Sequence, residues 1–211
     1  MADMQCGRDG LLTLGTVLTA RLCHDLSGPL HGLSAALAES GEDAEALALA
    51  QEAAAALRAR LALLRAAWGT PAALAAGELR RLGQGLPQAH RLRLELAGPV
   101  AAEALPAPVA RLLLNALLLG AESLPRGGAL ELAGEARRRV TLGIAGPGAA
   151  WPAGLEALLA NPGAALAAAR QPRRMQASLL SLFAAEAGAR VRLRPGAGPA
   201  TMLLDLAAGG G

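Results

Sequence analysis

The sequence has 211 residues, carries a net charge of +3 at pH 7 and is 53% hydrophobic, so it is long enough to bury a sizeable core. Most of the hydrophobic residues are Ala and Leu, which are strong helix formers, and this composition favours a helix-rich protein. The arginines are interspersed with acids and there is one Phe and no Tyr, whereas nucleic-acid-binding proteins usually gather positive charge on one face and supply stacking aromatics. We therefore expect no nucleic-acid partner.

The cysteines and the apolar runs indicate the cellular context. Cys6 and Cys23 are too few for a disulfide framework, which fits a reducing cytoplasm. The N-terminus lacks the apolar core of a signal peptide, and no apolar run approaches the roughly 20 residues needed to cross a bilayer. We expect a cytoplasmic protein without a membrane partner.

The first third of the chain predicts a helical hairpin. After residues 1–10, which we expect to be disordered, leucines at helical spacing predict one long helix over residues 11–39. A turn then leads into a second predicted helix over residues 42–67. This hairpin domain, residues 11–68, cannot bury its wide apolar stripe alone, so we predict a homodimer in which two copies form a four-helix bundle.

The rest of the chain, residues 72–208, changes to a mixed pattern of helices and strands. Helices are predicted where apolar residues follow helical spacing or form a continuous run: residues 78–86, 107–124, 151–160 and 173–188. Strands are predicted in short alternating or apolar segments: residues 91–96, 129–132, 138–144, 190–194 and 201–206. This order indicates an α+β sandwich as a second domain.

His24 is the candidate catalytic residue, because it lies opposite the leucine stripe of the first helix and is followed directly by Asp25. A neutral imidazole is a good nucleophile, and an adjacent carboxylate can hold the reactive tautomer and stabilise the cationic ring. The small residues Ala20, Ser27 and Gly28 on the same face leave room for a partner's aspartyl phosphate. A surface His beside an Asp is in most proteins merely solvated, so the pattern alone leaves both interpretations open.

A metal site is the weaker alternative for this segment. Its ligands would have to be Cys23, His24, Asp25 and His31. Consecutive residues of a helix diverge by about 100° around its axis, so these side chains cannot easily share one ion.

The segment around His24 resembles a known family. Residues 20–30, ARLCHDLSGPL, are similar to the H-box of sensor histidine kinases, and the run RLCHD resembles more closely the ChpT family of histidine phosphotransferases. Residues 112–128 resemble a kinase N-box helix, and residues 140–148 resemble the first glycine box. The resemblance implies a helical hairpin followed by a degenerate Bergerat-type domain, which is the α/β sandwich of histidine kinase ATPases.

Three departures from the kinase pattern imply that ATP is not bound. By the resemblance, the Asn that holds Mg²⁺ would fall at Leu119 and the Asp that reads adenine would fall at Ile144. The second glycine-rich loop would fall in residues 173–179, which contain no glycine. Aliphatic side chains cannot ligate Mg²⁺, and glycines are what let a backbone approach phosphates, so we expect no cofactor in this chain.

The resemblance then implies a phosphotransferase of a phosphorelay. His24 would accept a phosphoryl group from a receiver-domain aspartate of a hybrid histidine kinase and pass it to the receiver domain of a response regulator. In ChpT-like proteins the acceptors belong to the CtrA pathway, and Mg²⁺ would be held by the receiver. The residues expected to meet these partners lie near His24 on either helix: Val17, Ala20, Arg21, Ser27, Gly28, His31, Arg58 and Arg60.

Two other functions stay open on the sequence alone. One is a non-catalytic helical dimer that binds or sequesters response regulators, and the intact run from His24 to Leu30 disfavours it. The other is an active histidine kinase with an unusual nucleotide pocket, which the three departures disfavour.

Overall fold

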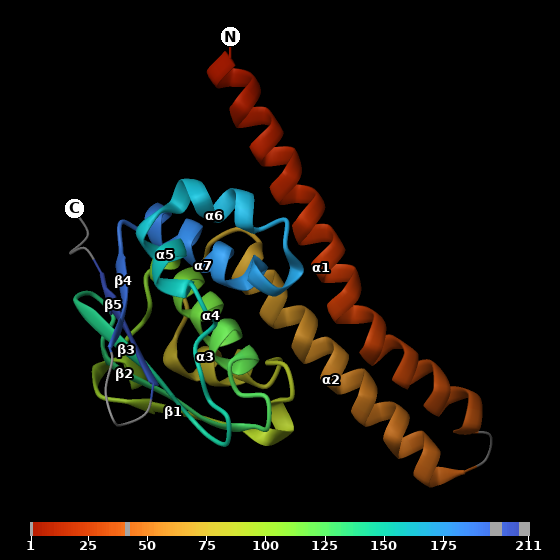
Figure 1. Cartoon of the computed structure of the whole chain (residues 1–211). Helices are drawn as coiled ribbons and strands as arrows, with labels where there is room; N and C mark the ends of the chain where they lie inside the picture. The colour runs from red at the N-terminus through yellow and green to blue at the C-terminus, as the bar shows by residue number, and fades with distance from the viewer. Residues whose placement is uncertain (1, 41–42, 195–199, 207–211) are drawn as a thin grey trace.

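The computed structural model describes residues 2–40, 43–194 and 200–206, and it begins with two long antiparallel helices (Figure 1). α1 (Ala2–Ser40) and α2 (Ala44–Trp68) form the helical hairpin that the sequence predicts. Residues 2–10, where we expected disorder, are helical. α2 begins where the Asp43 side chain accepts a hydrogen bond from the backbone N–H of Glu45, which satisfies one of the free donors at the helix start.

The second domain consists of a five-stranded sheet and helices that cover one of its faces (Figure 1). Its helices are α3 (Ala76–Gly83), α4 (Ala107–Glu122), α5 (Leu155–Ala160), α6 (Pro162–Ala168) and α7 (Met175–Glu186), with short 3-10 helices at Ala89–Arg91, Pro99–Ala101 and Pro172–Arg174. Its strands are β1 (Leu92–Ala97), β2 (Gly128–Glu135), β3 (Arg139–Ala145), β4 (Arg190–Arg194) and β5 (Ala200–Asp205). This arrangement confirms the predicted α+β fold class.

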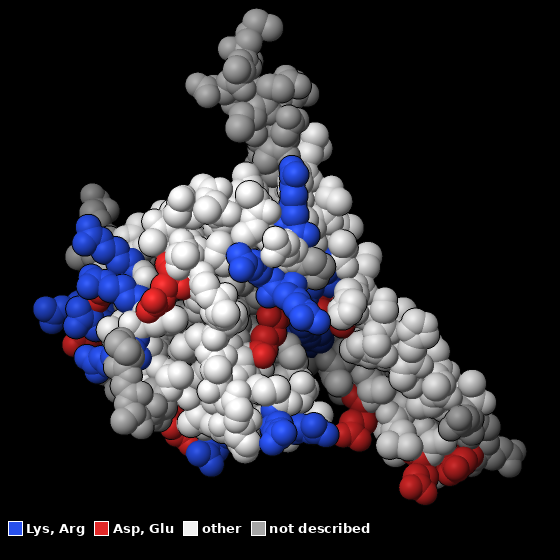
Figure 2. Space-filling view, in the orientation of Figure 1, with Lys and Arg blue, Asp and Glu red and all other residues white. Residues whose placement is uncertain are grey.

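The strands lie in the order β1-β2-β3-β5-β4, with β1 parallel to β2 and every other neighbouring pair antiparallel. Leu130 pairs with Ile144 and Leu142 pairs with Met202, so buried apolar side chains of adjacent strands share the covered face. Figure 2 shows basic side chains gathered at the β4 edge of the sheet. All the exposed residues of β4 are arginines: Arg190, Arg192 and Arg194.

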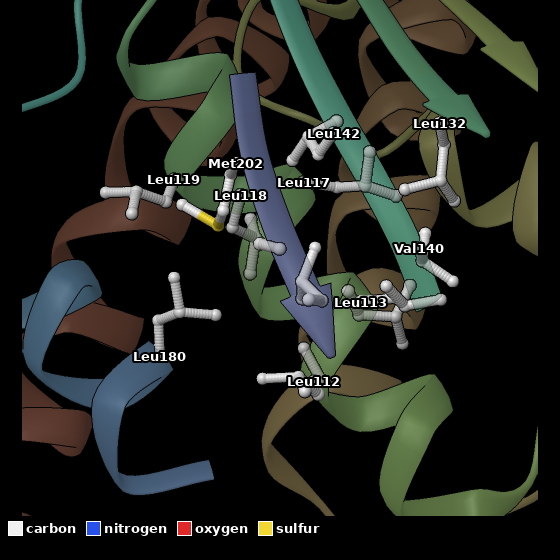
Figure 3. Packing of buried hydrophobic residues seen from close by; sticks show 14 of the residues in the cluster. Leu112, Leu113, Leu117, Leu118, Leu119, Leu132, Val140, Leu142, Leu180 and Met202 are labelled. Atoms are coloured by element: carbon white, nitrogen blue, oxygen red, sulfur yellow. The ribbon is translucent and has the colours of Figure 1, made fainter. Parts of the chain in front are cut away.

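α4 lies between the sheet and the hairpin and forms the centre of the core (Figure 3). Its residues 112–121 are all buried. A Cβ on Gly120 would lie 2.8 Å from Leu130 Cδ2, so the glycine allows the helix to approach the strands closely. Met202 of β5 and Leu180 of α7 pack into the same cluster.

Asn115 of α4 joins the hairpin to the second domain inside this core, and none of its surface is exposed. Its amide nitrogen donates to the carbonyl oxygens of Ala67 at 3.0 Å and Arg111 at 2.9 Å. Its side-chain oxygen accepts from the indole N–H of Trp68 and from the amide of Gln176, both at 3.1 Å. Because Ala67 is next to the last residue of α2, the contact satisfies a carbonyl that a helix end leaves without an intrahelical partner.

α6 is the element that the sequence does not predict. The helix begins at Pro162, with Asn161 as its N-cap residue. The Asn161 side chain accepts a hydrogen bond from the backbone N–H of Ala164 at 3.1 Å, and Pro162 occupies the first helical position, where a missing N–H costs nothing.

Candidate functional site

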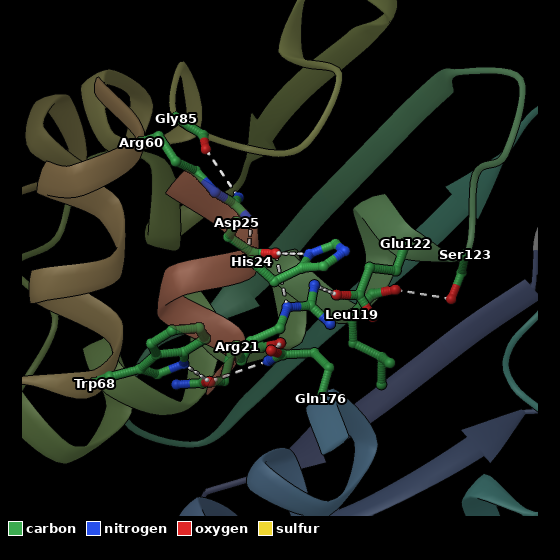
Figure 4. Close-up of polar contacts among 11 residues, drawn as sticks. Arg21, His24, Asp25, Arg60, Trp68, Gly85, Leu119, Glu122, Ser123 and Gln176 are labelled. Atoms are coloured by element: carbon green, nitrogen blue, oxygen red, sulfur yellow. Dashed lines mark hydrogen bonds and ion pairs between the residues drawn. The ribbon is translucent and has the colours of Figure 1, made fainter. Parts of the chain in front are cut away.

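His24 lies on α1 with its imidazole in solvent, as the helical spacing predicts. Its side chain is 85% exposed. The ring nitrogen Nδ1 lies 3.4 Å from Oδ1 of Asp25 (Figure 4). Since Nδ1 faces this carboxylate, Nε2 is the nitrogen left for a partner.

The Asp25 side chain is only 7% exposed, and two arginines bind it from opposite sides. Nε of Arg21, one turn earlier on α1, lies 2.9 Å from Oδ1. Nη2 of Arg60, on α2, donates to Oδ2 at 2.6 Å. The carboxylate is thus fixed in position at the point where it meets the His24 ring.

Each of these two arginines also contacts the second domain. Arg21 forms an ion pair through Nη2 with Glu122, the last residue of α4. Arg60 donates through Nη1 to the carbonyl oxygen of Gly85 at 3.1 Å. A Cβ on Gly85 would lie 2.2 Å from the Ala59 carbonyl oxygen, so the absence of a side chain lets this backbone approach α2. The second domain therefore takes part in holding Asp25.

The four charged groups, two arginines and two carboxylates, balance one another, but the two acids titrate differently. Burial opposes ionisation of Asp25, yet the contacts with Arg21 and the charges of both arginines outweigh it, so the pKa of Asp25 is lowered. Burial raises the pKa of Glu122, and the attraction of Arg21 only partly offsets it. Asp25 is therefore ionised at neutral pH.

This geometry suits a nucleophilic imidazole. An ionised carboxylate only accepts hydrogen bonds, so its contact with Nδ1 favours a proton there and leaves the lone pair on Nε2. When Nε2 attacks an electrophile the ring becomes cationic, and the neighbouring carboxylate stabilises that charge. Among the residues that the structure describes, this His–Asp pair is the arrangement that supports group transfer.

A cleft of about 280 Å³ lies beside His24, between α1 and the segment that joins α6 to α7. The following residues line it: Val17, Ala20, Arg21, His24, Ala169, Arg170 and Met175. Arg170 reaches across to α1 and donates to the Thr13 hydroxyl at 3.3 Å. The second domain therefore forms one wall of the space next to the candidate nucleophile.

The other predicted partner-binding residues fall into two groups. Ser27, Gly28, His31 and Arg58 are exposed, so their predicted role stays a prediction. Arg60 is 8% exposed and its guanidinium is engaged by Asp25 and Gly85, so its contact with a partner also stays a prediction. The prediction placed Arg60 near His24 but did not foresee that the Asp25 carboxylate would bind it.

Sequence reasoning missed Glu122 and Gly85. A signal for Glu122 was present, because it is the one acid in the largely apolar helix over residues 107–122. A charged residue in such a helix needs a partner when the helix is buried. Gly85 has no comparable signal, since its role depends on a backbone approach between segments far apart in the chain.

The positions that hold nucleotide in the kinase pattern are occupied by core side chains. Leu119 is 1% exposed and Ile144 is fully buried. Within residues 2–40, 43–194 and 200–206, no three His, Cys, Asp or Glu side chains are grouped so that they could hold a metal ion. Over the same ranges no helix combines the length and apolar character needed to cross a membrane.

The chain belongs to the histidine phosphotransferase family, since residues 76–198 match the family described as histidine phosphotransferase C-terminal domain. It is 36% identical over 126 residues to the protein phosphotransferase ChpT of Brucella abortus (strain 2308), a match that covers 56% of this chain and 59% of that protein. A solved structure of a bacterial phosphotransferase matches with a TM-score of 0.74 and 26% identity, over 92% of this chain and 96% of the other. A histidine kinase domain from Erythrobacter litoralis EL346 matches with a TM-score of only 0.41 and 12% identity, over 89% of this chain and 92% of that one.

Proposed function

We propose that the chain is a cytoplasmic histidine phosphotransferase of a bacterial phosphorelay, in which His24 carries the phosphoryl group. The observation that carries this proposal is the exposed His24 imidazole with the buried, ionised Asp25 behind it, in a member of the histidine phosphotransferase family. The similarity to a protein phosphotransferase supports the same activity. Cys23 is a free, exposed thiol, which suits a reducing compartment.

Transfer proceeds in two displacements at phosphorus. The Nε2 lone pair of His24 attacks the aspartyl phosphate of a donor receiver domain, on a hybrid histidine kinase; an N–P bond forms, and the P–O bond breaks with its electron pair left on the donor carboxylate. The carboxylate of a response-regulator receiver, of the CtrA type by the resemblance, then attacks phosphorus and the N–P pair returns to Nε2. Mg²⁺ is held by the receiver in both steps, and this chain supplies positioning and charge stabilisation.

ATP has no part in the proposed cycle. Buried Leu119 and Ile144 support this, because neither side chain can ligate Mg²⁺ or accept from adenine, and both positions are filled by the packed core. The phosphoryl group must then come from another protein.

We further propose that the active form is a homodimer. Large apolar side chains of both hairpin helices are exposed, including Leu30 at 52%, Leu47 at 48% and Leu61 at 41%. Figure 2 shows few charges on the visible face of the hairpin between its tip and the second domain. An apolar face of this kind on paired helices is buried when two hairpins form a four-helix bundle.

The test is to mix the purified protein with a receiver domain labelled at its aspartyl phosphate. We expect label on the wild-type protein and none on His24→Gln. His90→Gln is the matched control, because His90 is also exposed but lies in the short helix Ala89–Arg91, outside the hairpin, and its substitution should leave transfer intact. Labelled ATP alone should give no labelling. A His24→Gln variant that still relays phosphoryl, or a wild-type protein that only binds the receiver, would refute the proposal.

A further inference from the structure

The acid that supports His24 is held by residues of both domains, although none of the described side chains of the second domain forms a hydrogen bond or ion pair with Asp25 directly. Arg21 and Arg60 bind the two oxygens of the carboxylate. Each arginine uses a further nitrogen on the second domain, Arg21 on the Glu122 carboxylate and Arg60 on the Gly85 carbonyl. The position of Asp25 therefore depends on acceptors that lie far from it in the sequence.

Glu122 is the stronger of these two acceptors, because it is charged and it faces the arginine that shares Oδ1 with His24. Oδ1 of Asp25 lies 2.9 Å from Nε of Arg21 and 3.4 Å from Nδ1 of His24, so the cation and the imidazole share one oxygen. A charge-assisted ion pair to Glu122 restrains the Arg21 guanidinium, so that Arg21 holds the Asp25 carboxylate in one orientation. Oδ1 has a second lone pair, which is free to accept from Nδ1 of His24 when the carboxylate keeps this orientation.

We propose that Glu122 is a positioning residue for phosphotransfer, which acts through Arg21 to keep the Asp25 carboxylate available to Nδ1 of His24. The expected effect on the transfer rate rests on the proposed function, whereas the expected effect on the His24 tautomer does not. The proposal also gives the second domain a role in the chemistry of the hairpin. In that domain Leu119 and Ile144 fill the positions that hold nucleotide in the kinase pattern. Glu122 itself touches no reacting atom.

The first measurement needs no partner protein. Ring ¹⁵N NMR spectra of the free, full-length protein report which nitrogen of each neutral histidine carries the proton. In wild type we expect His24 mainly as the Nδ1–H tautomer. Glu122→Ala should shift His24 toward the Nε2–H tautomer, and Glu122→Gln should do so less, since its amide oxygen still accepts from Arg21. His31 is an internal reference, because its Nδ1 lies 2.8 Å from the Ser27 carbonyl, a contact that does not involve Glu122.

The second measurement is the rate of phosphoryl transfer from a labelled receiver. We expect Glu122→Ala to lower the rate at saturating receiver by about 5- to 20-fold with KM nearly unchanged, because the effect is on the imidazole and not on docking. Glu186→Gln is the matched control: Glu186 also pairs with an arginine, Arg111, on the hairpin-facing helix α4, but away from Asp25. It should leave both the rate and the His24 tautomer as in wild type.

The two proposals fail separately. A Glu122→Ala protein with wild-type tautomer and wild-type transfer rate would overturn the positioning role and leave the proposed function intact. A change in KM alone, without a change of tautomer, would also overturn it, since it would assign Glu122 to the docking surface. A wild-type protein that takes no phosphoryl would overturn the proposed function, while the tautomer of His24 would still decide the role of Glu122.

Discussion

The junction between the two domains offers a quantitative test, because the buried amide of Asn115 makes hydrogen bonds to both of them. Asn115→Leu keeps a side chain of similar size but leaves the Trp68 indole N–H and the Ala67 carbonyl without their partner. Gln176 keeps a second contact, at 3.1 Å to the Asn115 backbone carbonyl. Two groups are therefore orphaned by the substitution.

The expected loss of stability follows from that count. An unsatisfied buried polar group costs about 1–3 kcal/mol, so the pair gives a range of about 2–6 kcal/mol. Trp68 is only half-buried and water can reach part of it, which places the expected loss near the lower end, at about 3 kcal/mol. Small folded domains are stable by about 5–15 kcal/mol, so the variant should still fold.

The assay is urea unfolding followed by tryptophan fluorescence at one fixed protomer concentration. Trp68→Phe removes the indole N–H and leaves the Asn115 side-chain oxygen with its second donor, Gln176. It should therefore lower the free energy of unfolding by only about 1 kcal/mol. Asn161→Leu removes an exposed capping amide and should also cost about 1 kcal/mol. The Asn115→Leu/Trp68→Phe double variant should cost less than the sum of its single variants, since Phe has no N–H to orphan. A loss below about 1 kcal/mol for Asn115→Leu would refute the assignment of this amide as the bond between the domains.

Two further predictions concern charge and assembly. Because the pKa of Asp25 is lowered in the folded protein, its ionised form contributes stability above the ordinary carboxyl pKa of about 4, and that contribution is lost as the pH falls through the lower folded-state value. The difference in unfolding free energy between wild type and Asp25→Asn should therefore shrink on acidification below about pH 4. A difference that stays constant would contradict the ion-pair assignment. Leu47→Glu/Leu61→Glu should convert the proposed dimer to monomer in analytical ultracentrifugation while the helical circular dichroism stays, and a variant that remains dimeric would place the interface elsewhere.

The sequence predicts the elements of this fold well where their periodicity is long. α1, α2 and α4 follow from leucine spacing and from the continuous apolar run, because these patterns extend over several helical turns. α6 was missed, since it is only 7 residues long and lacks the leucine periodicity that marks the longer helices. The pairing of β1 with β2 across the whole of α4 is a long-range contact that local pattern does not encode.

In the candidate site too, the sequence predicts the local features but not the long-range contacts. The outward direction of His24 and the adjacency of Asp25 are local properties of one helix, and both could be read from the sequence. The burial of Asp25 and the binding of Arg60 to Asp25 and Gly85 depend on how α1, α2 and the second domain pack together. Spacing along a helix predicts which way a side chain points, but not which distant group will meet it there.

The arginines of β4 have a consequence for a chain so rich in alanine and leucine. β4 is an outer strand of the sheet, and a free strand edge can recruit another chain and start aggregation. A second copy of the same edge would bring Arg190, Arg192 and Arg194 against their own counterparts, and the repulsion between these cations opposes such growth. The protein can thus expose apolar helices for assembly while the β4 edge of its sheet resists open-ended polymerisation.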